Sequence, residues 1–242
     1  MKTNGRFLAY IAALMMLAIP GLSSSAVMII DLSGDEGGSI PLGKTGSATA
    51  TYSPGVEAHG YYLPNPAGNW EDADLYRRIE VGDRGLGICN PDEQVAFPED
   101  TPPGNCGGGD VNELDNMDLA EIITLKLPDG YKWVSVDVSS MDNDTPVQVE
   151  TARLYADADG IPNGTTPGSL GDTTISDIFG AAIVEQNITI PPANATAPYL
   201  MFEPVDVVDG IYDDNDFLVW KATIEELPPP PTDGCTPGFW KQ

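Results

Sequence analysis

The 242 residues carry 37 acidic side chains against 11 Lys and Arg, a formal net charge of −26, and a single histidine. Such a charge repels nucleic acid and anionic membranes, so it excludes partners of those two classes. It favours a well-solvated surface or the binding of calcium, and the composition leaves both explanations open.

The N-terminus has the pattern of a secretory signal peptide over residues 1–26. Basic residues precede an apolar run from Phe7 to Ile19, and small residues end the segment at Ala26. We expect cleavage after Ala26 and a secreted, extracellular or cell-surface protein. An uncleaved anchor is the alternative, because residues 27–30 extend the apolar run. No second apolar stretch follows, so we expect no membrane span in the mature chain.

Short apolar runs with period-two alternation, separated by Gly, Pro, Asn and Asp, predict β-strands through the rest of the chain. The predicted strands are Ala48–Tyr52, Leu75–Val81, Ile122–Leu127, Lys132–Val138, Val149–Ala156, Ala181–Ile190, Tyr199–Glu203 and Phe217–Ile224. Gly and Pro are frequent, so helix is limited to short turns at Leu119–Ile123 and Ile175–Ala182.

These elements predict an all-β fold, a single β-sandwich or jelly-roll-like domain over residues 27–227 with short flexible tails. The last predicted strand ends just before a proline run at 228–231. We therefore expect residues 228–242 to form a Pro-rich linker and the start of a C-terminal motif. The strand order stays open.

The cysteines predict one disulfide. Cys89 and Cys106 enclose a loop rich in Pro, Gly and acids, and in an exported protein this spacing favours a bond that staples the loop. A metal site is the alternative, but it needs clustered histidines and the chain has only His59. Cys235 remains, and its partner, intermolecular or in sequence beyond residue 242, stays open.

Two sets of motifs resemble bacterial exported proteins of the PEP-CTERM sorting class. The segment from Arg84 to Asn90, then Glu113-Leu114-Asp115-Asn116 and Glu121, resembles the "GLGV" turn and "E-x-D" segment of that class, and Phe217 and Val219 resemble its last strand. The Pro-Glu-Pro sorting tail is absent. In its place, Cys235 to Lys241 resembles the opening of a "CTPGFWK" C-terminal module, of which we expect more to follow. The resemblance implies a surface or matrix β-sandwich with no reaction attached.

Clusters of oxygen side chains are the candidate calcium ligands. One set, Asp157, Asp159 and Asn163, follows a predicted strand, and a plain turn is its alternative. The other, Asp213, Asp214 and Asp216, precedes the last strand, where adjacent carboxylates repel one another unless a cation or solvent screens them.

Aromatic residues could form a glycan-stacking face at Tyr61, Tyr62 and Trp70, although core packing is the alternative and one of the adjacent tyrosines should be exposed.

Nothing in the sequence has the pattern of a nucleophile with a base, so we expect no enzyme. The leading hypothesis is a non-catalytic, calcium-stabilised structural, matrix or adhesion protein that contacts surface or matrix components, including polysaccharide. A carbohydrate-binding module is the alternative. A glycoside hydrolase, with two carboxylates about 5 to 9 Å apart, comes third.

Overall fold

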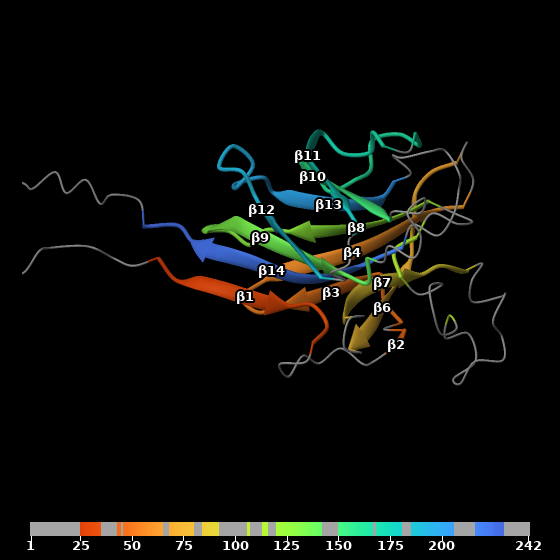
Figure 1. Ribbon diagram of the computed structural model, residues 1–242, viewed down its shortest axis with the longest axis horizontal. Helices are drawn as coiled ribbons and strands as arrows, with labels where there is room; N and C mark the ends of the chain where they lie inside the picture. The colour runs from red at the N-terminus through yellow and green to blue at the C-terminus, as the bar shows by residue number, and fades with distance from the viewer. Residues whose placement is uncertain are drawn as a thin grey trace, which may run out of the picture.

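The computed structural model describes residues 25–34, 43–44, 46–64, 68–79, 84–91, 106, 113–115, 120–141, 150–166, 168–180, 185–205 and 216–229. In this part of the chain the regular elements are all strands, and they form two antiparallel sheets (Figure 1). No helix in these ranges is long and apolar enough to cross a membrane.

The first sheet has seven strands, in the order β12-β9-β14-β7-β6-β2, with β1 pairing to β14 beside β7. Its strands are β1 (Val27–Asp31), β2 (Gly43–Lys44), β6 (Asp74–Ile79), β7 (Arg84–Cys89), β9 (Tyr131–Ser139), β12 (Gln186–Thr189) and β14 (Leu218–Glu226). The longest strands, β9 and β14, pair along most of their length and form the centre of this sheet.

The second sheet also has seven strands, in the order β11-β10-β13-β8-β4-β3, with β5 pairing to β4. Its strands are β3 (Thr49–Tyr52), β4 (Val56–Leu63), β5 (Glu71–Asp72), β8 (Ala120–Lys126), β10 (Thr151–Asp157), β11 (Thr173–Phe179) and β13 (Tyr199–Pro204). After β7 the chain alternates between the sheets for several strands, as in a jelly roll.

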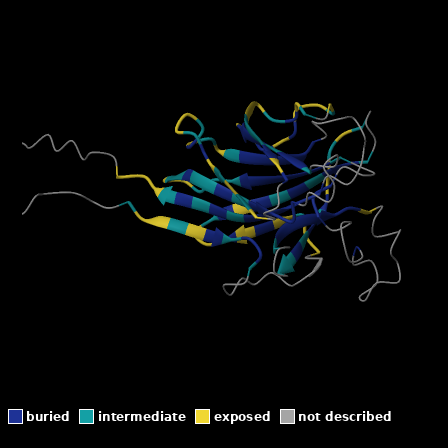
Figure 2. Cartoon of the chain, in the orientation of Figure 1, coloured by how far each residue is buried: buried dark blue, intermediate teal, exposed yellow. Residues whose placement is uncertain are grey.

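Each sheet turns one face toward a shared hydrophobic core, as the alternation of side chains in a strand requires. The core includes Trp133 and Val136 from β9 of the first sheet, and Leu154, Leu200 and Phe202 from β10 and β13 of the second. In Figure 2 the buried residues follow the strands, whereas exposed ones gather in the connecting loops and along β1. The predicted all-β sandwich is confirmed.

Most of the predicted strands are confirmed, and they correspond to β3, β6, β8, β9, β10, β13 and β14. For Ala181–Ile190, the structure shows β12 near its end, and residues 181–184 lie outside the described part. The two segments that could have held at most a short helical turn form strands over most of their described residues. Ile175–Ala182 falls largely in β11, which pairs with β10, and β8 begins at Ala120. Thr and Ile suit a pleated, paired surface, and this tertiary pairing decides the conformation.

Among the strands that the prediction missed, β4 and β7 contain glycines, a residue that usually weakens a strand. A Cβ at Gly60 in β4 would lie 2.9 Å from the carbonyl oxygen of Ala73, and one at Gly85 in β7 would lie 2.6 Å from that of Val219. Gly85 also has a φ of 143°. Both glycines allow a close approach of neighbouring backbone. The segment that resembles a "GLGV" turn is therefore a strand here.

The predicted disulfide is confirmed. Cys89, the last residue of β7, is bonded to Cys106, and both residues are buried. The bond therefore fixes the far end of the intervening loop to the first sheet.

Candidate functional site

The outer face of the second sheet carries a row of polar and aromatic side chains, because β4 alternates buried and solvent-facing residues. Val56 and Ala58 are buried in the core, whereas Glu57, His59 and Tyr61 face outward. The register then sets their neighbours. On β8, Lys126 pairs with Glu57 and Thr124 pairs with His59. On β13, Tyr199 pairs with Lys126.

These side chains line a groove of ≈ 110 Å³, which we call the sheet groove. Its floor and sides come from β3, β4, β8, β13 and the loop after β10. The lining residues are Thr49, Glu57, Ala58, His59, Tyr61, Thr124, Lys126, Asp159, Gly160 and Tyr199.

One end of the sheet groove holds an ion pair exposed to solvent. The Lys126 ammonium donates to both carboxylate oxygens of Glu57, at 3.2 and 3.1 Å. This hydrogen bond, together with the charge of Glu57, raises the pKa of Lys126. The lysine therefore stays cationic over the physiological range. About half of each side chain is accessible, so both could also meet a ligand.

The other end holds two stacked rings. The His59 imidazole lies over the Tyr61 ring, with centroids 4.1 Å apart and planes inclined by 26°. Its Nε2 lies 2.9 Å from Oδ1 of Asp72. Burial raises the pKa of Tyr61 to about 12, and the negative charges of Asp72 and Asp159 add to this effect. The Tyr61 hydroxyl is therefore protonated at neutral pH and able to donate.

The loop after β10 forms a wall of the sheet groove, and Asp157 organises that loop. Its Oδ1 accepts hydrogen bonds from the backbone N–H groups of Asp159 and Gly160, at 3.1 and 2.7 Å. Its Oδ2 accepts from the N–H of Asp172 at 3.2 Å. Asp172 in turn accepts from the side chain of Asn163 at 2.9 Å. These are the contacts of an anchored turn.

The same loop is pressed against aromatic rings. A Cβ at Gly160 would lie 2.5 Å from the Tyr199 ring, so only glycine fits there, where φ is also +73°. The Trp70 indole also donates to the carbonyl of Gly164 at 2.7 Å. The wall is therefore held against aromatic side chains at two points, Gly160 and Gly164.

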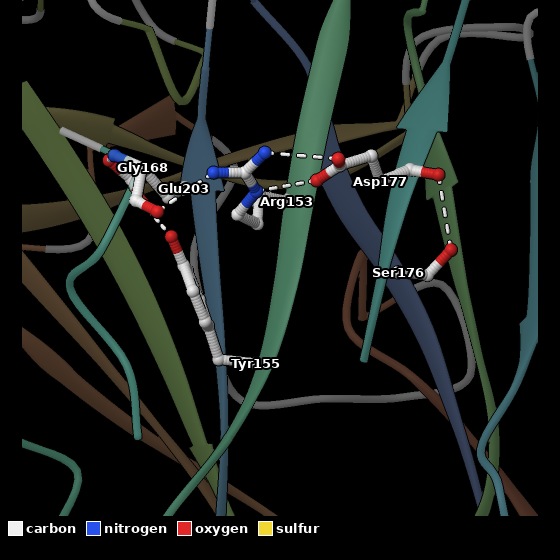
Figure 3. Close-up of polar contacts among 6 residues, drawn as sticks. All are labelled: Arg153, Tyr155, Gly168, Ser176, Asp177 and Glu203. Atoms are coloured by element: carbon white, nitrogen blue, oxygen red, sulfur yellow. Dashed lines mark hydrogen bonds and ion pairs between the residues drawn. The ribbon is translucent and has the colours of Figure 1, made fainter. Parts of the chain in front are cut away.

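A buried polar network ties the far end of this loop to the sheet (Figure 3). The carboxylate of Glu203 accepts from the Tyr155 hydroxyl at 2.5 Å and from the N–H of Gly168 at 2.7 Å. Arg153 donates to the carbonyl of Gly168 at 2.8 Å and makes a two-point ion pair with Asp177. Burial raises the pKa of Glu203. The network braces the loop and is closed to solvent at Glu203.

The predicted calcium ligands that the structure describes make different contacts. Asp157 is buried and its oxygens accept backbone N–H groups, Asp159 lines the sheet groove, and Asn163 bonds Asp172. Asp216 is buried before β14, while Asp213 and Asp214 lie outside the described residues. Among described positions no group of three or more His, Cys, Asp or Glu side chains could hold a metal ion.

The three predicted stacking aromatics have different environments. Tyr62 is buried and donates to Glu71, so it does not contribute to an exposed ring face. Tyr61 is partly exposed in the sheet groove, and Trp70 supports the loop wall. One tyrosine of the adjacent pair faces outward, as alternation along a strand requires.

Sequence reasoning missed Glu57, Lys126 and Tyr199 as site residues. The signal was the alternation of Val56-Glu57-Ala58-His59 along β4, which places Glu57 and His59 on one face. The pairing with β8 and β13, which completes the set, links segments far apart in the chain and has no local signature.

No family model matches the chain, and no curated protein matches it. Among solved structures, the chain is similar to the K1 cleaved adhesin domain of Lys-gingipain from Porphyromonas gingivalis W83. The sequences are 14% identical, the match covers 84% of this chain and 90% of that chain, and the TM-score is 0.25. A TM-score this low carries no argument about function. The fold and site define the chain as a β-sandwich protein with a polar groove on the outer face of one sheet.

Proposed function

We propose that this chain is an exported, non-catalytic β-sandwich protein that works in adhesion or matrix structure at the cell surface. The observation that carries the proposal is the sheet groove, a polar hollow on the outer face of the second sheet. The signal-peptide pattern, the acidic composition and the disulfide between Cys89 and Cys106 are typical of extracellular proteins and support it.

The arrangement of side chains in the groove favours binding over catalysis. Glu57 is engaged with Lys126, and His59 with Asp72, so the charged groups are paired with one another. The described lining of the groove includes no serine or cysteine, and among the described contacts neither of its threonines, Thr49 and Thr124, is hydrogen-bonded to the His59 imidazole. This is the chemistry of a recognition surface.

The second candidate function is a carbohydrate-binding module, because aromatic and hydrogen-bonding side chains meet in one groove. Tyr61, His59 and Tyr199 lie there with Thr49 and Lys126. Saccharide sites combine rings with hydrogen-bonding groups in this way. Calcium stabilisation through Asp213, Asp214 and Asp216 remains part of the proposal, tested by the effect of chelator on unfolding.

A retention assay tests the proposed function. The full chain is exported from a bacterial host, and the purified product is incubated with insoluble envelope and matrix material from the producing cells. We expect the wild type to sediment with this material and to release no soluble saccharide from it. Failure of the wild type to sediment, or release of sugar with time, would contradict the proposal.

A pair of exposed β3 residues supplies the variants. Thr49 lines the sheet groove, whereas Thr51, two residues along the same strand, does not. We expect Thr49→Trp to fill the groove and abolish retention, and Thr51→Trp to leave it unchanged. Equal retention of both variants would show that another surface makes the contact.

A further inference from the structure

The sheet groove presents a mixed set of hydrogen-bonding groups. Lys126 only donates, Glu57 and Asp159 only accept, and the hydroxyls of Tyr199 and Thr49 do both. A ligand that satisfies such a set must itself donate and accept at adjacent positions. Sugar hydroxyls do this on neighbouring ring carbons, since every hydroxyl is both a donor and an acceptor.

The backbone around the groove argues against a peptide ligand. The groove lies on the face of β4, β8 and β13, whose N–H and C=O groups are used in the ladders between these strands. Peptides that add to a sheet need an unpaired edge instead. A ligand on this face is therefore recognised through side chains, which suits a saccharide.

The charge in and around the groove selects against acidic ligands. Its carboxylates, Glu57, Asp159 and the adjacent Asp72, outnumber its one ammonium, Lys126. The chain as a whole carries −26. A uronic acid or a sulfated sugar would bring a further negative charge into this field and would be repelled. A neutral sugar avoids that cost.

The size and the covered rings define the binding mode. Pockets for drug-sized ligands measure about 300–1,000 Å³, so a groove of ≈ 110 Å³ takes a small part of a ligand, on the scale of one ring. His59 covers one face of Tyr61, and Gly160 covers one face of Tyr199. One face of each ring is therefore closed to a ligand, whereas the hydroxyls remain for hydrogen bonds, and we expect hydrogen bonds to contribute more than stacking.

From these observations we infer that the sheet groove binds a single residue of a neutral polysaccharide by hydrogen bonds, with Lys126 and Tyr199 as the specificity-determining side chains. This inference rests on the proposed function and names its ligand class. Tyr199 pairs directly with Lys126 across β13 and β8, and both side chains line the groove beside Tyr61.

The test has two stages and uses the full exported chain. A glycan array that holds neutral, uronic acid and sulfated oligosaccharides identifies the class, and calorimetric titration with the best neutral oligosaccharide gives Kd. We expect signals on neutral glycans only. Binding confined to the anionic glycans would overturn the charge argument, and an array without binding would overturn the inference.

Matched variants locate the site. Lys126→Gln should weaken binding about tenfold, as expected for a lost charged hydrogen bond. Lys132→Gln is the control, because Lys132 forms a comparable ion pair with Glu225, at 3.1 Å, on the other sheet. Tyr199→Phe should also weaken binding, whereas stacking alone would leave Kd unchanged. Equal affinities for the wild type and the groove variants would overturn the site.

The two proposals fail in different ways. Retention on envelope material together with a blank array would overturn the neutral saccharide and leave the adhesion role standing. Loss of both retention and glycan binding would overturn both.

Discussion

Replacement of Asp157 by Ala should destabilise the protein by about 3 kcal/mol. The Asp157 carboxylate accepts three backbone N–H groups, those of Asp159, Gly160 and Asp172. A net value of about 1 kcal/mol for each bond gives the total. Gly160 is buried, so its N–H cannot turn to water once the carboxylate is gone. The midpoint of thermal unfolding should fall by about 6–12 °C for a domain of this size.

The assay is thermal unfolding of the wild type and Asp157→Ala, first with excess chelator and then with millimolar calcium. If Asp157 anchors the turn, the two proteins should differ by the same amount in both solutions. Asp129→Ala, at an exposed turn, is the control and should change stability by less than about 0.5 kcal/mol. A difference that appears only in calcium would refute this reasoning and make Asp157 a metal ligand.

Three further predictions concern stability. Reduction of the bond between Cys89 and Cys106, which are 17 residues apart in sequence, should cost about 3 kcal/mol in chemical denaturation, and an unchanged midpoint would contradict this. Burial raises the pKa of Glu203 above its ordinary 4.5, so the folded state binds more protons, and this residue's contribution to stability should fall as pH rises above 4.5. A Glu203→Gln variant should therefore gain stability relative to wild type over that range, and a constant difference would refute it. In the same denaturation assay, Gly85→Ala should lower the free energy of unfolding more than Gly130→Ala does. Both glycines have positive φ, but only Gly85 lies against the β14 backbone. Equal losses of unfolding free energy in the two variants would contradict this reasoning.

The strands that could be predicted are those whose own sequence places apolar residues on one face. In Tyr131–Ser139, Val136 and Val138 alternate with polar residues and are buried, and Trp133 is buried as well because the pairing with β14 is irregular between Trp133 and Ser135. The disulfide was also predictable, because two cysteines that enclose a loop in a chain with a signal-peptide pattern have few alternatives. Local chemistry was sufficient in both cases.

The remaining elements depend on contacts between distant segments. Gly60 and Gly85 suggest turns locally, yet each allows a neighbouring strand to approach closely. Ile175–Ala182 resembles a helical turn until β10 pairs with it as β11. The conformation of these segments depends on the strands that pair with them, so it cannot be predicted from the residues of the segment alone.

The candidate site was only partly predictable for the same reason. The sequence indicated Tyr61 and Asp159 separately, as a stacking ring and a calcium ligand. The structure places both in one groove with Lys126 and Tyr199. The loop after β10 makes this possible, since Asp157 and Trp70 hold it against the sheet.

His59 offers the most direct test of the sheet groove, because it is the only histidine in the chain and lines the groove. The measurement is NMR of its imidazole C–H signals in the full exported chain, without a histidine tag, during titration with the best neutral oligosaccharide from the array. We predict that these signals shift progressively and saturate with the calorimetric Kd. Ligand binding that shifts other protein signals and leaves His59 unmoved would contradict the account, because the contact would then lie elsewhere on the sandwich.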